Sequence, residues 1–143
     1  MAGSSMTFTY DDGYNGDGKQ NGIRRVIATW TSDDSTGAVS GTTRNIVGSL
    51  VKAVTDPGDA APTDNYDIAI TDDYGVDVLG ACQSGLGNRH TSTTQQVYFL
   101  VLDAAGPPLA QSIHPVVCSP LTIAITNAGN SKNGVLVLYY RPF

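Results

Sequence analysis

The sequence predicts an all-β fold, a two-sheet β-sandwich with a jelly-roll-like arrangement. All 13 acidic residues are aspartate, which favours turns and caps over helix interiors. They cluster with glycine, asparagine and proline between short runs of Val, Ile, Leu, Thr and Tyr, the usual pattern of strands separated by turns. Seven or eight such strands suit two packed sheets better than a propeller or a solenoid.

The composition describes one domain with a weakly charged surface. A chain of 143 residues is long enough to bury roughly two-thirds of its unfolded surface. Only 15% of the residues are charged, so Thr, Ser, Asn and Gln supply much of the polar surface, which suits packing against another protein. The net charge of −5 opposes binding to phosphates, and we therefore expect no nucleic-acid partner.

We also expect no membrane partner and no export signal. Residues 1–7 lack a basic region followed by an apolar one, and no stretch approaches the ~20 apolar residues that span a bilayer. Cys82 and Cys118 are the only cysteines, and neither belongs to a C-x-x-C pair that would indicate zinc or redox chemistry. We expect two buried thiols, with a disulfide between them as the alternative.

An N-terminal arm or loop is expected over residues 1–22, followed by the single β-sandwich domain over residues 23–143. Residues 23–30 predict the first long strand from their apolar alternation. Residues 42–54 fit both strand and helix spacing, but Gly48 and the β-branched residues favour a strand. Residues 96–102 are apolar on both faces, which is typical of a central strand.

Two hairpins and one irregular connection complete the prediction. Residues 65–79 predict a hairpin, because 65–71 alternate and Asp72-Asp73-Tyr74-Gly75 form a turn signal. Residues 103–120 hold four of the seven prolines, so we expect them to cross the surface or to join the two sheets, with little regular pairing. Residues 121–126 and 134–140 predict a second hairpin around a polar loop.

No motif in the chain demands a metal or a cofactor. Asp11, Asp12, Asn15 and Asp17 offer oxygen ligands of the kind that calcium prefers. Their spacing differs from an EF-hand loop, and no glutamate is present to close the site. We therefore favour an Asx-turn loop here and expect no metal and no cofactor.

Enzyme signatures are equally weak, and we expect no catalytic residues. The pairs Asp33-Asp34 and Asp72-Asp73 are interpreted as solvated turns rather than as a general acid and base across a cleft. His90 and His114 are the only imidazoles, and no serine lies in a G-x-S-x-G motif. Residues 85–88 are rich in glycine but lack the Lys-Ser/Thr pair of a phosphate loop.

The aromatic residues divide into a core group and a surface group. Trp30, Tyr66 and Tyr98 fall on strand faces where core packing is the ordinary role, although a sugar-stacking platform is the alternative. The other tyrosines of interest are freer to meet a partner, namely Tyr10, Tyr14, Tyr74, Tyr139 and Tyr140.

A set of turns and strand edges stands out between residues 26 and 141: residues 56–68 (DPGDAAPTDNYDI), 77–79 (DVL), 88–89 (NR), 126–130 (TNAGN) and 139–141 (YYR). These segments resemble a group of small structural proteins encoded among the head genes of tailed bacteriophages. The resemblance implies a virion component, a decoration or cement protein on the capsid exterior that is assembled in the host cytoplasm. The implied partners are the major capsid protein and the chain itself, as a homodimer or homotrimer.

Both terminal segments are expected to reach neighbouring subunits, because termini with exposed aromatics are well suited to ordering on contact. The interface residues predicted on this ground are Phe8, Tyr10, Tyr14, Tyr139, Tyr140, Arg141 and Phe143. Two alternatives stay open: a tail or head-fibre component of the virion, and a carbohydrate-binding β-sandwich module.

Overall fold

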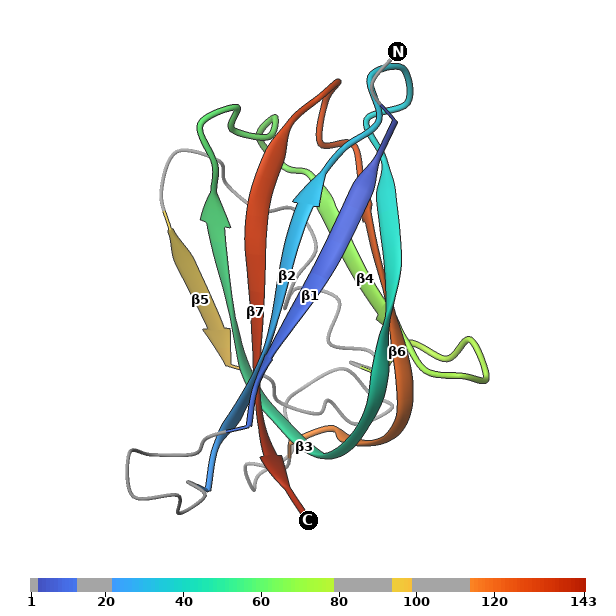
Figure 1. Cartoon of the computed structure of the whole chain (residues 1–143), viewed down its shortest axis with the longest axis vertical. Helices are drawn as coiled ribbons and strands as arrows, with labels where there is room; N and C mark the ends of the chain where they lie inside the picture. Colours follow the sequence, from blue (N-terminus) through green and yellow to red (C-terminus); the bar gives the residue numbers. More distant parts are fainter. Residues whose placement is uncertain (1–2, 13–21, 79–93, 99–113) are drawn as a thin grey trace, which may run out of the picture.

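The computed structural model describes residues 3–12, 22–78, 94–98 and 114–143, and every element in these residues is a β-strand (Figure 1). All strand pairs are antiparallel, and they form a single sheet in the order β1-β2-β7-β3-β6-β4, with β5 paired to β3. The predicted all-β class is confirmed. The described strands are joined in one continuous sheet rather than in two separate sheets. The strands are β1 (Ser5–Asp11), β2 (Arg24–Thr31), β3 (Val39–Pro57), β4 (Asp67–Thr71), β5 (Gln95–Tyr98), β6 (Val116–Thr126) and β7 (Asn133–Pro142).

The long strand β3 turns this sheet back on itself. Its first part pairs with β6, and its last part pairs with β7 on one edge and β5 on the other. Figure 1 shows β3 curving between these two parts at the end of the molecule where β7 finishes, which we call the lower end. The sheet therefore has a β2–β7 side (β1, β2, β7, β5 and the last part of β3) and a β4–β6 side (β4, β6 and the first part of β3).

The hydrophobic core lies between the two sides. Alternate residues point inward along the strands, as the period-two pattern of a half-buried strand requires. The rings of Trp30 and Tyr66 meet in this core at 5.9 Å between centroids, which confirms the predicted core role of both. The largest fully buried side chains are Val26, Trp30, Ile46, Leu50, Ile70, Leu121, Ile123, Ile125, Leu136 and Leu138.

Part of the expected N-terminal arm is an edge strand. Residues 5–11 pair along their whole length with β2, because Met6, Phe8 and Tyr10 alternate with polar residues and pack against the core. Burial of these side chains holds β1 on the sheet. Residues 13–21, the rest of the predicted loop, lie outside the described residues.

The predicted hairpin between residues 121–126 and 134–140 is wrong in its pairing. Both strands form, but β3 lies between them in the sheet. Their connecting loop is anchored elsewhere, since the Ala128 amide donates to Gly37 and the Ala128 carbonyl accepts from the Thr63 amide at 2.8 Å. Ser32 adds a hydroxyl that donates to the Gly129 carbonyl at 2.6 Å. These contacts hold the loop across the end of the molecule opposite the lower end, which we call the upper end. The loop there connects one side of the sheet to the other.

The expected irregular connection ends earlier than predicted, because residues 116–120 already belong to β6. Pro120 is tolerated there since it lies opposite a register shift of β3 between Thr42 and Asn45, a position where a proline costs no ladder hydrogen bond. The hydroxyl of Thr43 accepts from the next amide, that of Leu121, at 3.0 Å. A side chain thus replaces backbone pairing at the irregularity.

The first predicted hairpin is confirmed at its turn. The Gly75 amide donates to the Asp72 carbonyl at 3.0 Å, and the returning chain makes a bridge between Thr71 and Asp77. Of the predicted central strand over residues 96–102, residues 96–98 belong to β5, which pairs with β3 alone among the described strands, and residues 99–102 lie outside the described residues. The strand prediction for residues 42–54 is also confirmed, within β3.

Candidate functional site

The candidate site is an exposed apolar surface on the β4–β6 side, near the lower end. Val47 of β3 and Cys118 of β6 are direct partners in the register. Their neighbours Ile46 and Val117 are buried, so Val47 and Cys118 face outward. Val116 follows on the same face of β6 and is 64% exposed.

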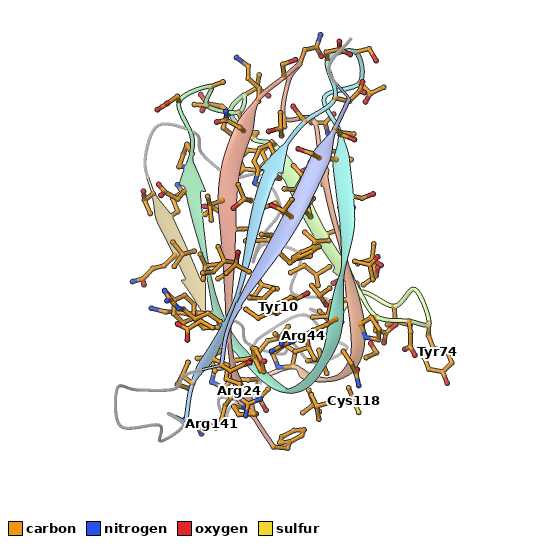
Figure 2. The ribbon with its side chains drawn as sticks, viewed as in Figure 1. Tyr10, Arg24, Arg44, Tyr74, Cys118 and Arg141 are labelled. Carbon is orange, nitrogen blue, oxygen red and sulfur yellow. The ribbon has the colours of Figure 1, made fainter. Side chains whose placement is uncertain are left out.

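The hairpin after β4 extends this surface. A hollow of about 200 Å³ is lined by Val116 and Cys118 on one side and by Tyr74 and Val78 on the other. Tyr74 is 87% exposed, and Val76 beside it is also exposed; Figure 2 shows Tyr74 and Cys118 pointing outward at this part of the molecule. We call the set Val47, Tyr74, Val76, Val116 and Cys118 the apolar patch.

Local hydrogen bonds fix the hairpin that carries Tyr74 and Val76. The Asp72 carboxylate accepts from the Tyr74 amide at 2.9 Å and from the Val76 amide at 3.0 Å. The Asp73 amide donates to the Ser119 hydroxyl on β6 at 3.4 Å. The Asp72-Asp73 pair therefore builds a turn, as predicted, and holds two apolar side chains beside a rigid strand.

The predicted interface residues on β1 take part in an internal network. The Tyr10 hydroxyl accepts from the Arg44 amide at 2.8 Å, and the Arg44 guanidinium lies 4.1 Å from the centre of the Tyr10 ring and pairs with Asp12. Phe8 stacks on Tyr10 with 6.4 Å between ring centroids. These contacts join β1 to the first part of β3 (Figure 2), so Phe8 and Tyr10 help to close the fold, and their part in an interface stays a prediction. Tyr14 lies outside the described residues.

Arg44 is held in this network as a permanent cation. Burial lowers the pKa of its guanidinium, but hydrogen bonds to Tyr140 and Asp12 outweigh this effect and leave the pKa raised. Arg25 behaves similarly: its hydrogen bond to Asp11, at 2.6 Å, is the largest cause of a raised pKa. Both arginines therefore act as charged clamps between strands.

The four predicted interface residues at the C-terminus divide into three environments. Tyr140 is only 3% exposed, which makes the interface prediction wrong for this residue. Tyr139 is half-buried, and the Lys52 ammonium lies 4.7 Å from the centre of its ring. Arg141 is exposed, and Phe143 is 78% exposed just beyond the pair of Pro142 with Gly48.

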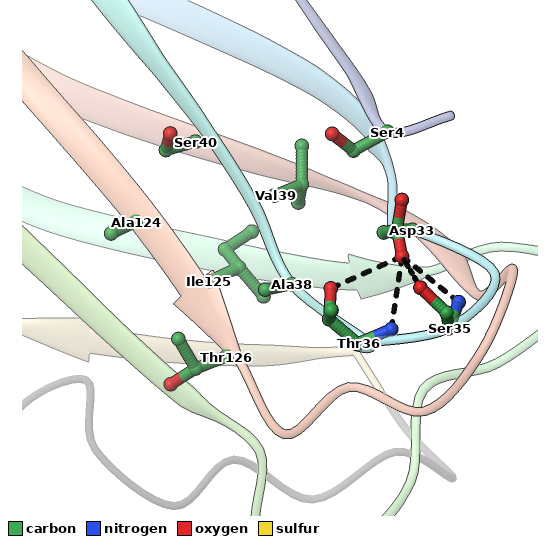
Figure 3. A pocket seen from close by; sticks show the side chains of 10 residues that line it. All are labelled: Ser4, Asp33, Ser35, Thr36, Ala38, Val39, Ser40, Ala124, Ile125 and Thr126. Carbon is green, nitrogen blue, oxygen red and sulfur yellow. Dashed lines mark hydrogen bonds between the residues drawn. The ribbon is translucent and has the colours of Figure 1, made fainter.

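A second surface feature is a hydroxyl-lined groove of about 480 Å³ at the upper end (Figure 3). One carboxylate oxygen of Asp33 accepts from both the amide and the hydroxyl of Ser35 and of Thr36. These bonds, with the Ser35 hydroxyl the largest cause, lower the Asp33 pKa to about 2. Asp33 is thus a turn anion, as predicted for the Asp33-Asp34 pair, and is unsuited to proton transfer near neutral pH. The groove is lined by Ser4, Asp33, Ser35, Thr36, Ala38, Val39, Ser40, Ala124, Ile125 and Thr126.

The other candidate site residues of the sequence either form ion pairs within the fold, lie apart from one another, or lie outside the described residues. Asp11 pairs with Arg25 and Asp12 with Arg44, while Asn15 and Asp17 are not described. Within the described ranges, no three His, Cys, Asp or Glu side chains gather to hold a metal ion. His90 is not described, and His114 is half-buried just before β6. In the same ranges no helix is long and apolar enough to cross a membrane.

The cysteines were expected to be buried, and for Cys118 this expectation is wrong. Its thiol is free and exposed on β6, whereas Cys82 lies outside the described residues. Sequence reasoning missed the apolar patch because residues 116–118 are apolar at every position, so the alternation that assigns strand faces is absent. Comparison with known proteins found no matching family model and no matching curated sequence.

Proposed function

We propose that this protein is a bacteriophage capsid decoration protein, which binds the outside of the assembled head and stabilises it by bridging capsomers. The observation that carries the proposal is the apolar patch. Its side chains stand on strands and on a hydrogen-bonded turn, and its centre, Val47, Val116 and Cys118, is uncharged. Exposed apolar patches with polar rims mark protein–protein contacts.

The mechanism of a decoration protein is binding without turnover. A protein that binds the assembled shell more tightly than free capsomers adds its binding free energy to the stability of the shell. A contact of this kind needs a rigid surface, because ordering a flexible segment on binding costs free energy. The patch meets this requirement, since Asp72 fixes the turn that carries Tyr74 and Val76.

Two loops at the upper end offer a structural explanation of the resemblance to bacteriophage proteins. Residues 56–68 and 126–130, two of the segments that carry the resemblance, are hydrogen-bonded to each other. The Thr63 amide donates to the Ala128 carbonyl at 2.8 Å, and the Thr63 hydroxyl donates to the Asn127 carbonyl at 2.6 Å. Related sequences would share these loops because the loops connect the two sides of the sheet.

We further propose that the bent sheet is a jelly-roll-like β-sandwich, with the β2–β7 side and the β4–β6 side as its two layers and β3 as the strand that belongs to both. The net charge of −5 suits a place on the capsid exterior, away from the packaged DNA. Assembly from the host cytoplasm needs no export step in this scheme.

One observation favours a second candidate function, carbohydrate binding. The upper-end groove of about 480 Å³ combines serine and threonine side chains with the ionised Asp33. Hydroxyl groups and a carboxylate are suitable partners for the hydroxyls of a sugar. The two candidate sites lie at opposite ends of β6, so substitutions separate them.

Cosedimentation with purified particles of the virus that encodes the chain tests the proposal. We expect hundreds of copies per particle for the native protein and a large loss of binding for Val116→Asp. Thr126→Asp is the matched control, because Thr126 is exposed at the other end of the same strand. A handful of copies would indicate a tail or fibre component instead. No particle binding, with glycan binding that Thr126→Asp abolishes, would replace the proposal by the carbohydrate-binding function.

A further inference from the structure

The outer face of the β2–β7 side carries its side chains in aligned rows. In the middle row, Ile27 of β2 pairs with Val137 of β7, which pairs with Val54 of β3. Thr9 and Gln96 end this row on β1 and β5. The residues next to the three aliphatic ones along each strand are buried, so the row faces outward as a half-buried apolar stripe.

The row nearer the lower end carries most of the charge. Asp11 pairs with Arg25 at 2.6 Å, and Arg25 stands beside Tyr139 in the register. Lys52 is the next partner of Tyr139, with its ammonium 4.7 Å from the centre of the tyrosine ring. On β3 this lower row therefore carries a cation.

The row nearer the upper end is neutral except at its β3 end. Thr7, Thr29 and Val135 follow one another across β1, β2 and β7, and Val135 pairs with Asp56 of β3. Asp56 is exposed and accepts a hydrogen bond from the Thr94 hydroxyl at 2.7 Å. The two outer rows thus place opposite charges, Lys52 and Asp56, at equal distances from Val54 along the same strand.

We propose that this face packs against the same face of a second copy of the chain, about a two-fold axis that runs along the middle row. Such an axis reverses the strand direction, so the lower row of one copy lies over the upper row of the other. Lys52 then faces Asp56 of the partner subunit, and Tyr139 faces Val135 of the partner subunit. Val54 and Val137 meet their own counterparts on the axis.

The charge complementarity favours a second copy as the occupant. With the axis on the middle row, Lys52 of each copy faces Asp56 of the partner subunit, so no like charges on β3 oppose each other. Sheets packed face to face keep their strands within about 30° of one another, which the reversed alignment allows. Five strands at ~4.8 Å spacing and seven residues at ~3.4 Å rise span a face of about 400 Å² per copy. The total of about 800 Å² is below the size of a standard stable interface, so we expect a weak dimer whose population depends on concentration.

The bridging consequence of this dimer rests on the proposed function. The apolar patch lies on the β4–β6 side, away from the dimer face, and the two-fold axis places the two copies of the patch at opposite ends of the dimer. A dimer with two separated, identical binding surfaces is suited to joining two capsomers.

Charge exchange on β3 tests the interface in solution. Sedimentation velocity on the full chain, over a hundredfold range of concentration, should show a monomer–dimer equilibrium. Lys52→Asp and Asp56→Lys alone should each weaken dimerisation by about tenfold or more, because each opposes like charges across the axis. The double variant should restore it. Effects of each substitution confined to one copy cannot produce that rescue of dimerisation. The control variant Thr126→Asp, on the other side of the sheet, should dimerise as the native protein does.

Three results would each refute the proposed dimer interface. A native protein that stays monomeric or forms trimers, single variants that dimerise as the native protein does, or a double variant as weak as the singles would each refute the two-fold face. Circular dichroism confirms that each variant is folded. Particle binding separates the two proposals: loss of the dimer with retained cosedimentation refutes only the interface, and an intact dimer without cosedimentation refutes only the decoration function.

Discussion

Gly48 of β3 lies so close to Arg141 of β7 that a Cβ atom on the glycine would stand 2.2 Å from the Arg141 carbonyl oxygen. Gly48 is also the residue at which β3 changes partners, since it pairs with both Val117 of β6 and Pro142 of β7. The close approach is between backbone atoms, which cannot move aside as a side chain does. The bend that gives the sheet its two sides therefore requires glycine at this position.

The substitution Gly48→Ala should destabilise the protein strongly. The new methyl group forces β7 away from β3, and overpacking of this kind costs about 1–3 kcal/mol or more. Urea unfolding monitored by Trp30 fluorescence measures the change in the free energy of unfolding. Gly22→Ala is the matched control, because a Cβ at Gly22 meets no atom within 4 Å. Equal unfolding midpoints for the two variants would contradict the steric argument.

The buried hydroxyl of Thr43 should be essential for the irregular pairing of β3 with β6. It accepts from the Leu121 amide at 3.0 Å and donates to the Arg44 carbonyl at 2.7 Å. Thr43→Val keeps the shape but leaves a buried amide unsatisfied, so we expect a loss of about 1–3 kcal/mol in denaturant unfolding. Thr42→Val, at an exposed neighbour, should change stability by less than about 0.5 kcal/mol. A Thr43→Val variant as stable as the control would show that water replaces the hydroxyl.

Local patterns predicted the strands well, because alternation is a property of a few consecutive residues. Residues 23–30 and 134–140 correspond closely to β2 and β7. Pairing was not predictable in the same way. The loop after β6 reads as a hairpin turn, but its course depends on bonds from Ala128 to Gly37 and Thr63, which are distant in sequence. Single-sequence patterns do not report such contacts.

For the candidate site, the strands were also easier to predict than the faces on which their side chains lie. Tyr139 and Tyr140 are neighbours on one strand, so their side chains must point to opposite faces. The buried series Leu136, Leu138, Tyr140 has period two in the structure, but Val135, Val137 and Tyr139 between them are equally apolar, so the sequence does not indicate which tyrosine faces the core. Residues 116–118 by themselves do not assign the faces of Val116 and Cys118 either, because the intervening Val117 is equally apolar. Their exposure follows from the unbroken alternation of β6, whose buried residues are Val117, Ser119, Leu121, Ile123 and Ile125. This signal was missed because the predicted strand began at residue 121.

The Asp33 turn should give acid sensitivity to the upper end. Its folded-state pKa is lowered from 3.8 to about 2, so the stabilisation is complete above the unfolded pKa and is lost as the pH falls from 3.8 toward 2. Asp33→Asn keeps an acceptor oxygen without the charge. We therefore expect the difference in melting temperature between native protein and variant to shrink across that interval. Asp59→Asn, at an exposed carboxylate of a neighbouring loop, is the control. A difference that stays constant with pH would refute the role of the Asp33 charge.

Cys118 provides a chemical probe of the apolar patch. Because its thiol is exposed on a rigid strand, a Cys82→Ser variant should react fully with a thiol reagent before unfolding. Reaction only after denaturation would contradict the exposed position. Particle-bound protein should be protected from the reagent, and a bulky maleimide on Cys118 should prevent cosedimentation, since it covers the surface between Val47 and Val116. The same label on a Thr126→Cys variant that lacks both native cysteines should leave particle binding intact. Equal binding of both labelled proteins would remove the patch from the capsid contact and leave the decoration function without its surface.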